Sequence, residues 1–161
     1  MATDHKTLYA TALRNTHALE SQLKGLENYP EYARVLQDHV GVTRGQLQRL
    51  EKAMGDLGES PSALKEAVTN LAGRIGATVH AMAQDETLKN LYAGYGYQYD
   101  QIASYRSLVV FAEAAGHSAH VAGFKEAVEE EERGARGVDG IIETVTRQYI
   151  ERTVGGAKAD S

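Results

Sequence analysis

The sequence predicts an all-α chain that folds as a four-helix bundle with a helical crossover between helices two and three. Apolar residues recur at alternating spacings of three and four along several long segments, as they do in helices that bury one face. Prolines occur only at positions 30 and 61, so few points interrupt helical structure. The 161 residues can bury one core, and we expect a single domain over 1–161 with a core over roughly 4–154 and a polar tail over 155–161.

The first two helices are predicted on either side of Pro30. Thr3 or Asp4 can cap the first helix. Its expected buried stripe is Tyr9, Ala12, Thr16, Leu19, Leu23 and Leu26. The second helix is expected to end at Gly58, and its stripe is Leu36, His39, Thr43, Gln46, Leu50, Ala53 and Leu57. Because the connection at 28–30 is short, the two helices should be antiparallel neighbours.

A crossover helix and two further long helices are predicted in the rest of the chain. Ser60 caps the crossover, which runs over 61–82. Asp85 caps the third helix, which Gly116 ends, and its inward residues are Leu88, Leu91, Tyr95, Gln98, Ile102, Tyr105, Val109 and Ala112. The fourth helix should run from Ser118 to about Val154, although three glycines inside it each cost about 1 kcal/mol against alanine. Those glycines are Gly134, Gly137 and Gly140.

Composition excludes several classes of function. A net charge of −5 and a pI near 5.7 give no basic surface of the kind that binds nucleic acid. The absence of cysteine excludes disulfides, thiolate metal sites and a thiol nucleophile. The first twenty residues lack the apolar segment of a signal peptide, and no apolar run approaches the roughly 20 residues that span a bilayer. We therefore expect a cytoplasmic protein without nucleic-acid or membrane partners.

A carboxylate interrupts the apolar stripe of the fourth helix. That stripe is Val121, Phe124, Val128, Glu131, Ala135, Val138, Ile142, Val145 and Tyr149. A buried carboxylate is costly unless it is hydrogen-bonded, paired, protonated or bound to metal. Each long helix has polar residues on or beside its stripe near mid-length, and we expect them to face one another as a buried polar layer. This layer is Glu20, His39, Gln46, Gln98, Gln101, Glu130 and Glu131.

Three interpretations of Glu131 are open from the pattern. A register slip of one residue would leave it partly exposed in a charged run with Arg133 and Arg136. Hydrogen bonds to Gln98, Gln101 or His39 would satisfy it inside the bundle, and this is the favoured interpretation. A metal ion would satisfy it as well.

Bundles that bind two iron or manganese ions take a glutamate from each of two helices and a Glu-x-x-His motif from each of the other two. In this chain the third helix offers neutral amides at Gln98 and Gln101, and Val42 stands one turn beyond His39, where a ligand is expected. No metal cofactor is therefore the favoured expectation, with iron or manganese as the alternative. A site for a single ion, formed by Glu20, His39 and Glu131, remains geometrically open. The candidate ligands are Glu20, His39, Glu130 and Glu131.

The third helix is also rich in tyrosine. Tyrosines that lie on several faces of one helix cannot all be core residues, and the outward rings are expected to pack on the crossover helix or in a dimer interface. The tyrosines of this helix are Tyr92, Tyr95, Tyr97, Tyr99 and Tyr105.

Four segments taken together resemble the YciE/YciF family of bacterial ferritin-like proteins. The segments are LRNTHALESQL (13–23), DHVGVTRGQLQRLE (38–51), YDQIASYRSL (99–108) and AEAAGH (112–117). Their order and spacing are similar to those of the family over roughly residues 5–145. The resemblance implies a ferritin-like bundle, a dimer and an association with stress response, with metal-binding glutamates in many members.

The resemblance also assigns roles by position. The acidic residues that it retains are Glu20, Glu130 and Glu131. The second-helix glutamate falls on Val42, both third-helix glutamates fall on Gln98 and Gln101, and the aspartate after the acidic pair falls on Ala135. These departures indicate a site converted from carboxylate–metal to carboxylate–amide contacts.

The sequence thus favours a non-catalytic, stress-associated, ferritin-like homodimer that acts through assembly or through a protein partner. The alternative is an iron- or manganese-dependent oxidase or peroxide-scavenging protein. That alternative would use Glu20, His39, Glu130 and Glu131.

Overall fold

The computed structural model describes residues 20, 23, 25–60, 62 and 87–156. Most of the predicted first helix, the crossover beyond Ser62, the Asp85 cap and the end of the polar tail lie outside these residues. Within the described ranges the secondary structure is all helical, and no strand occurs. The helices are α2 (Pro30–Asp56), α4 (Thr87–Ala114), α5 (Ser118–Asp139) and α6 (Ile142–Val154). None of the described helices is both long and apolar enough to cross a membrane.

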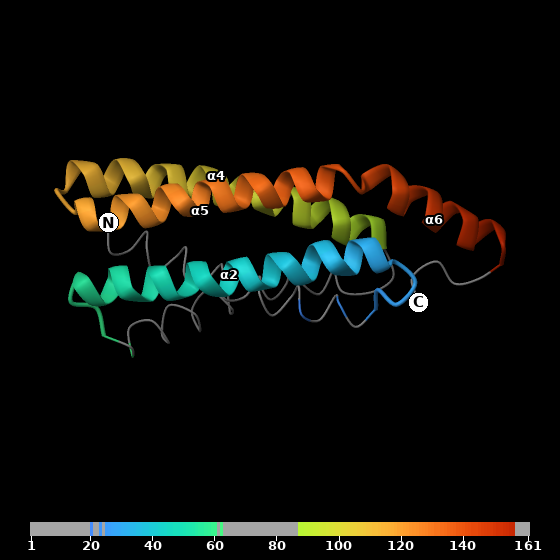
Figure 1. Cartoon of the computed structure of the whole chain (residues 1–161), viewed down its shortest axis with the longest axis horizontal. Coiled ribbons are helices and arrows are strands. Elements are labelled where there is room, and N and C mark those ends of the chain that lie inside the picture. The colour runs from blue at the N-terminus through green and yellow to red at the C-terminus, as the bar shows by residue number, and fades with distance from the viewer. Residues whose placement is uncertain (1–19, 21–22, 24, 61, 63–86, 157–161) are drawn as a thin grey trace.

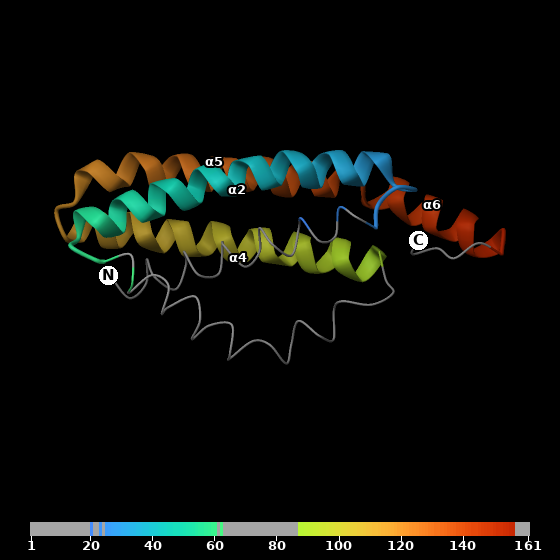
Figure 2. The same cartoon turned by 90° about the horizontal axis from the view of Figure 1, so that it is seen from below.

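Three long helices lie side by side, and α6 continues beyond the end of α5 at an angle (Figures 1 and 2). α5 packs against both α4 and α2. The carboxyl-terminal halves of α2 and α4 share one core cluster with the start of α5, so α2 and α4 run in the same direction. This parallel direction is what a crossover between the second and third helices requires.

Local signals in the sequence account for the helix ends. Pro30 occupies the first turn of α2, where its missing N–H costs no hydrogen bond. Gly58 and Gly116 have φ angles of 79° and 73°, a left-handed conformation that glycine adopts without a side-chain clash. The His117 amide then bonds the Ala112 carbonyl at 2.9 Å and closes the end of α4. The predicted ends of the second and third helices are therefore confirmed.

The prediction of one continuous fourth helix to Val154 is wrong. α5 ends at Asp139, Gly140 and Ile141 separate it from α6, and α6 begins at Ile142. Gly140 weakens the helix at this point, and the break turns Ile141 into the core, where it is 4% exposed. Burial of Ile141 stabilises the bent path in place of the straight one.

The described core consists of two apolar clusters with polar side chains between them. The first cluster is Leu47, Leu50, Ala53, Met54, Tyr105, Leu108, Ala112, Phe124 and Ala127. The second cluster is Leu26, Tyr29, Tyr32, Leu36, Val40, Leu91, Val138, Ile141 and Val145. All of the stripe residues predicted for the second and third helices are buried or half-buried, as a helical period of about 3.5 requires.

Candidate functional site

A layer of buried polar side chains lies between the two apolar clusters, and all three long helices contribute to it. Its buried members are His39, Thr43, Gln46, Gln98, Gln101 and Glu131. Glu131 is only 1% exposed, so it is not a surface acid of the charged run at 129–132. The hydroxyl of Thr43 donates to the His39 carbonyl within α2. The other five side chains face the interior, where a polar group without a partner is costly.

Glu131 and His39 approach each other across the helices. Oε2 of Glu131 lies 3.7 Å from Nε2 of His39, and both groups are buried. Burial raises the pKa of the Glu131 carboxyl to about 7, a hydrogen bond from Gln46 partly opposes the rise, and the charge of Glu130 adds to it. Burial also lowers the pKa of His39 to about 4. Burial thus disfavours the charged form of both groups, and at 3.7 Å the two atoms lie farther apart than a hydrogen bond.

Gly134 allows α5 to come close to this pair. A Cβ at position 134 would lie 2.8 Å from Nε2 of Gln98 and 3.0 Å from Nδ1 of His39. Any residue larger than glycine would therefore push into two side chains of the layer. Gly134 stands one turn after Glu131, so the same face of α5 supplies both the carboxyl group and the space for its neighbours.

Glu130 forms its ion pair with an arginine of the same chain. Arg49 forms an ion pair with Oε2 of Glu130, and the Gln46 amide donates to the same oxygen at 3.2 Å. A second ion pair joins Arg49 to Glu126 at 3.7 Å. The two adjacent glutamates thus have different surroundings: Glu130 has a guanidinium and an amide, whereas Glu131 has an imidazole and amides.

Several buried polar atoms of the layer have no hydrogen-bond partner among the described residues. They are Nε2 of His39, Oε1 of Gln46, Oε1 of Gln98, Nε2 of Gln101, the hydroxyl of Tyr105 and Oε2 of Glu131. Burial raises the pKa of Tyr105, and the nearby Glu131 carboxylate raises it further, so the hydroxyl remains protonated and available as a donor. These atoms include both donors and acceptors, which allows small rotations to pair them with one another.

The residues do not fit a two-metal centre. Among the described residues, no three His, Asp or Glu side chains converge as they would around a metal ion. Glu20 forms an ion pair with Arg44 and is about one-third exposed, while Glu130 is paired with Arg49. His39 and Glu131 are brought together, but their other described neighbours are amides. The candidate ligands Glu20, His39, Glu130 and Glu131 therefore do not form one ligand group here.

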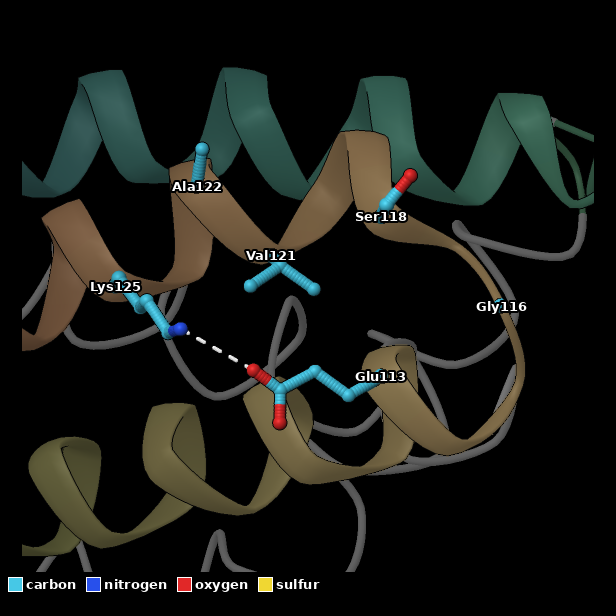
Figure 3. A pocket seen from close by; sticks show the side chains of 6 residues that line it. All are labelled: Glu113, Gly116, Ser118, Val121, Ala122 and Lys125. Atoms are coloured by element: carbon cyan, nitrogen blue, oxygen red, sulfur yellow. Dashed lines mark hydrogen bonds and ion pairs between the residues drawn. The ribbon is translucent and has the colours of Figure 1, made fainter.

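A pocket of about 500 Å³ lies at a different place, beside the turn between α4 and α5 (Figure 3). Its lining residues are Glu113, Gly116, Ser118, Val121, Ala122 and Lys125. Lys125 donates to Glu113 across it at 3.1 Å, and both side chains are exposed. No buried charged group lines this pocket, so the polar layer remains the better candidate site.

Sequence reasoning missed Arg49, Tyr105 and Gly134 as parts of the site. Arg49 follows Gln46 by three residues, a spacing that places both on one helix face and was available as a signal. Tyr105 belongs to the predicted stripe of the third helix, but a tyrosine in a stripe does not reveal where its hydroxyl lies. The three-residue spacing of the glycines on α5 suggests a close approach of helices without saying which glycine makes it.

The described part of the chain is thus an all-helical bundle whose core is crossed by a carboxylate–amide–imidazole layer. Residues 5–151 match the family described as "Domain of unknown function (DUF892)". The match covers nearly the whole chain, and the chain belongs to this family.

Proposed function

We propose that the protein is a ferritin-like four-helix bundle of the YciE/YciF type, a cytoplasmic homodimer whose two-metal site has become a metal-free polar layer. Its role is non-catalytic and stress-associated, and it acts through assembly or through a protein partner. The layer fixes the register of the helices, a role that buried polar groups have in some other bundles.

One observation carries this proposal. The two adjacent acids of α5 already have partners from the chain: Arg49 neutralises Glu130, and His39 faces Glu131 with amides beside it. A divalent ion would have to displace the Arg49 guanidinium and would gain only neutral amide oxygens from α4, which are weaker ligands than carboxylates.

Metal analysis tests the proposal directly. The purified chain is incubated with iron(II) and manganese(II), desalted and measured by elemental analysis, and its melting temperature is recorded with and without a chelator. We expect no retained metal and no effect of the chelator, because an ion bound to the native state would stabilise it. The matched control is Arg49→Gln, which replaces the guanidinium group beside Glu130 by a neutral amide.

Retention of one or two ions per chain, with a melting temperature that falls on chelation, would overturn the proposal. It would support the alternative of an iron- or manganese-dependent oxidase or peroxide-scavenging protein. Glu20, His39 and Glu131 would then be the ligands to substitute first.

A further inference from the structure

α4 carries a second stripe, displaced by one residue from its core stripe and therefore about 100° around the helix from it. Its residues are spaced alternately by three and four, and every one of them is exposed: Lys89, Tyr92, Gly96, Tyr99, Ala103, Arg106, Val110 and Glu113. A helix packs along another helix through a stripe of residues with this spacing. α4 therefore has an exposed stripe with helix-packing spacing beside its buried one. Two charged residues of the exposed stripe, Arg106 and Glu113, also pair with side chains of α5.

The outer stripe is more apolar than a solvent-facing stripe requires. Tyr92, Tyr99 and Val110 are 51%, 53% and 63% exposed, and they are three of the six large apolar side chains that the described residues expose. Small residues stand on both sides of Tyr99, at Gly96 and Ala103. A Cβ at Gly96 would meet no atom of the described residues within 4 Å, so packing within the described chain does not require a glycine there. Small residues beside an aromatic ring form a hole into which another helix can insert a side chain.

We propose that this stripe docks a second copy of the chain, with the two α4 helices antiparallel and related by a two-fold axis near position 101. In that register Tyr99 faces Ala103 of the second copy, and Tyr92 faces Val110. Each pair places a large side chain against a smaller one, and the two-fold axis repeats every contact. The proposal rests on the homodimer of the proposed function and assigns its interface.

Charge selects the antiparallel direction. The antiparallel register places Lys89 of one copy opposite Glu113 of the other at both ends of the stripe. A parallel pair would instead place Lys89 against Lys89, Arg106 against Arg106 and Glu113 against Glu113, and like charges directly opposite disfavour pairing. Lys125 of the same chain uses Oε1 of Glu113. A carboxylate has lone pairs for more than one donor, so this bond does not prevent a second contact.

The stripe is long enough for a stable pair. From Lys89 to Glu113 it extends about 36 Å at about 1.5 Å per residue, which is nearly seven helical turns. Central tyrosines are among the residues that contribute most to protein interfaces, and Tyr99 lies next to the proposed axis.

Disulfide trapping tests both the surface and the direction, since the chain has no cysteine of its own. Tyr92→Cys and Val110→Cys chains of different mass are prepared, mixed and oxidised. We expect a mixed disulfide between the two variants and little disulfide within either variant alone. In the proposed register, position 92 of one copy lies 18 residues, or about 27 Å along the helix axis, from position 92 of the other copy, and the same holds for position 110. A disulfide requires Cα atoms within about 7 Å. Disulfides within each variant alone would show a parallel pair and overturn the proposal.

A pair of substitutions tests the energetics. Tyr99 on the stripe and Ile150 on α6 are both 53% exposed, so Tyr99→Arg and Ile150→Arg remove equally accessible apolar side chains. By sedimentation equilibrium we expect Tyr99→Arg to raise the dimer dissociation constant by about 30-fold or more, as expected for a central aromatic residue, and Ile150→Arg to change it little. Circular dichroism confirms that both variants are folded.

The outcomes separate this inference from the proposed function. A wild-type dimer that Tyr99→Arg leaves intact would overturn the α4 interface and leave the homodimer in place. A wild-type chain that is monomeric at all concentrations would overturn both. A monomeric chain whose Tyr92→Cys thiol is protected from alkylation would show that another segment of the same chain covers the stripe.

Discussion

The contact between Gly134 and the polar layer predicts that Gly134→Ala destabilises the chain, although alanine favours helices. The new Cβ would lie 2.8 Å from Nε2 of Gln98 and 3.0 Å from Nδ1 of His39. Carbon and nitrogen atoms in ordinary contact are about 3.5–4.0 Å apart. Both neighbours are buried, so neither can move into solvent to make room.

The magnitude follows from two opposing effects. Overpacking of a buried site costs about 1–3 kcal/mol, and the replacement of glycine by alanine in a helix gains about 1 kcal/mol. Gly134→Ala should therefore lower the free energy of unfolding by up to about 2 kcal/mol. Gly137→Ala on the same helix is the matched control, because its Cβ would meet Val35 at an ordinary 3.7 Å. It should raise the free energy of unfolding by up to about 1 kcal/mol.

Urea unfolding followed by circular dichroism measures both variants at one protein concentration, since association of chains would change the apparent stability. The difference between the two variants should be about 1–3 kcal/mol, with Gly134→Ala the less stable. Equal stabilisation by both alanines would refute the reasoning, because α5 would then not approach His39 and Gln98 as closely as described.

Three further predictions concern the layer. The pKa of Glu131 is raised from 4.5 to about 7, so its contribution to stability is complete below pH 4.5 and is lost as the pH rises through 7. At about 1.36 kcal/mol per pH unit this loss reaches about 3 kcal/mol, and urea titrations of wild type and Glu131→Gln at several pH values should show it only in wild type. The pKa of His39 is lowered from 6.5 to about 4, so wild type should also lose stability as the pH falls from 6.5 through 4. His39→Gln should not lose stability over this pH range in the same titration. If the variant still loses stability on acidification, other groups cause the loss. The combined substitution of Val42, Gln98 and Gln101 by glutamate should give a chain that retains iron or manganese after desalting; a folded triple variant without metal would show that these positions are not former ligand sites.

The inward faces of the helices could be predicted because they depend on a local period. Leu36, His39, Gln46, Gln98 and Ile102 are all buried as their spacing indicates. Helix ends at Gly58 and Gly116 were predictable for a similar reason, since a left-handed residue after a helix favours glycine whatever packs nearby.

The break at Gly140 and the partners of the two acids were not predictable in this way. Whether a helix bends at a glycine depends on what the bend buries, and the burial of Ile141 arises only when α2, α4 and α6 meet. Likewise, the choice of Arg49 as the partner of Glu130 depends on the rotation of α2 relative to α5. Periodicity locates each face of a helix but leaves the pairing of side chains across helices undetermined.

The break between α5 and α6 also determines which part of the chain can unfold locally. α6 has 13 residues, too few for a stable isolated helix in water, and Val145 is its one fully buried residue. α5 has six buried residues and meets both α4 and α2. Amide hydrogens of α6 should therefore exchange with solvent through local opening, while those around Glu131 should exchange only when the whole bundle unfolds. The end of the molecule can thus loosen and reclose without exposing the buried carboxyl group to water.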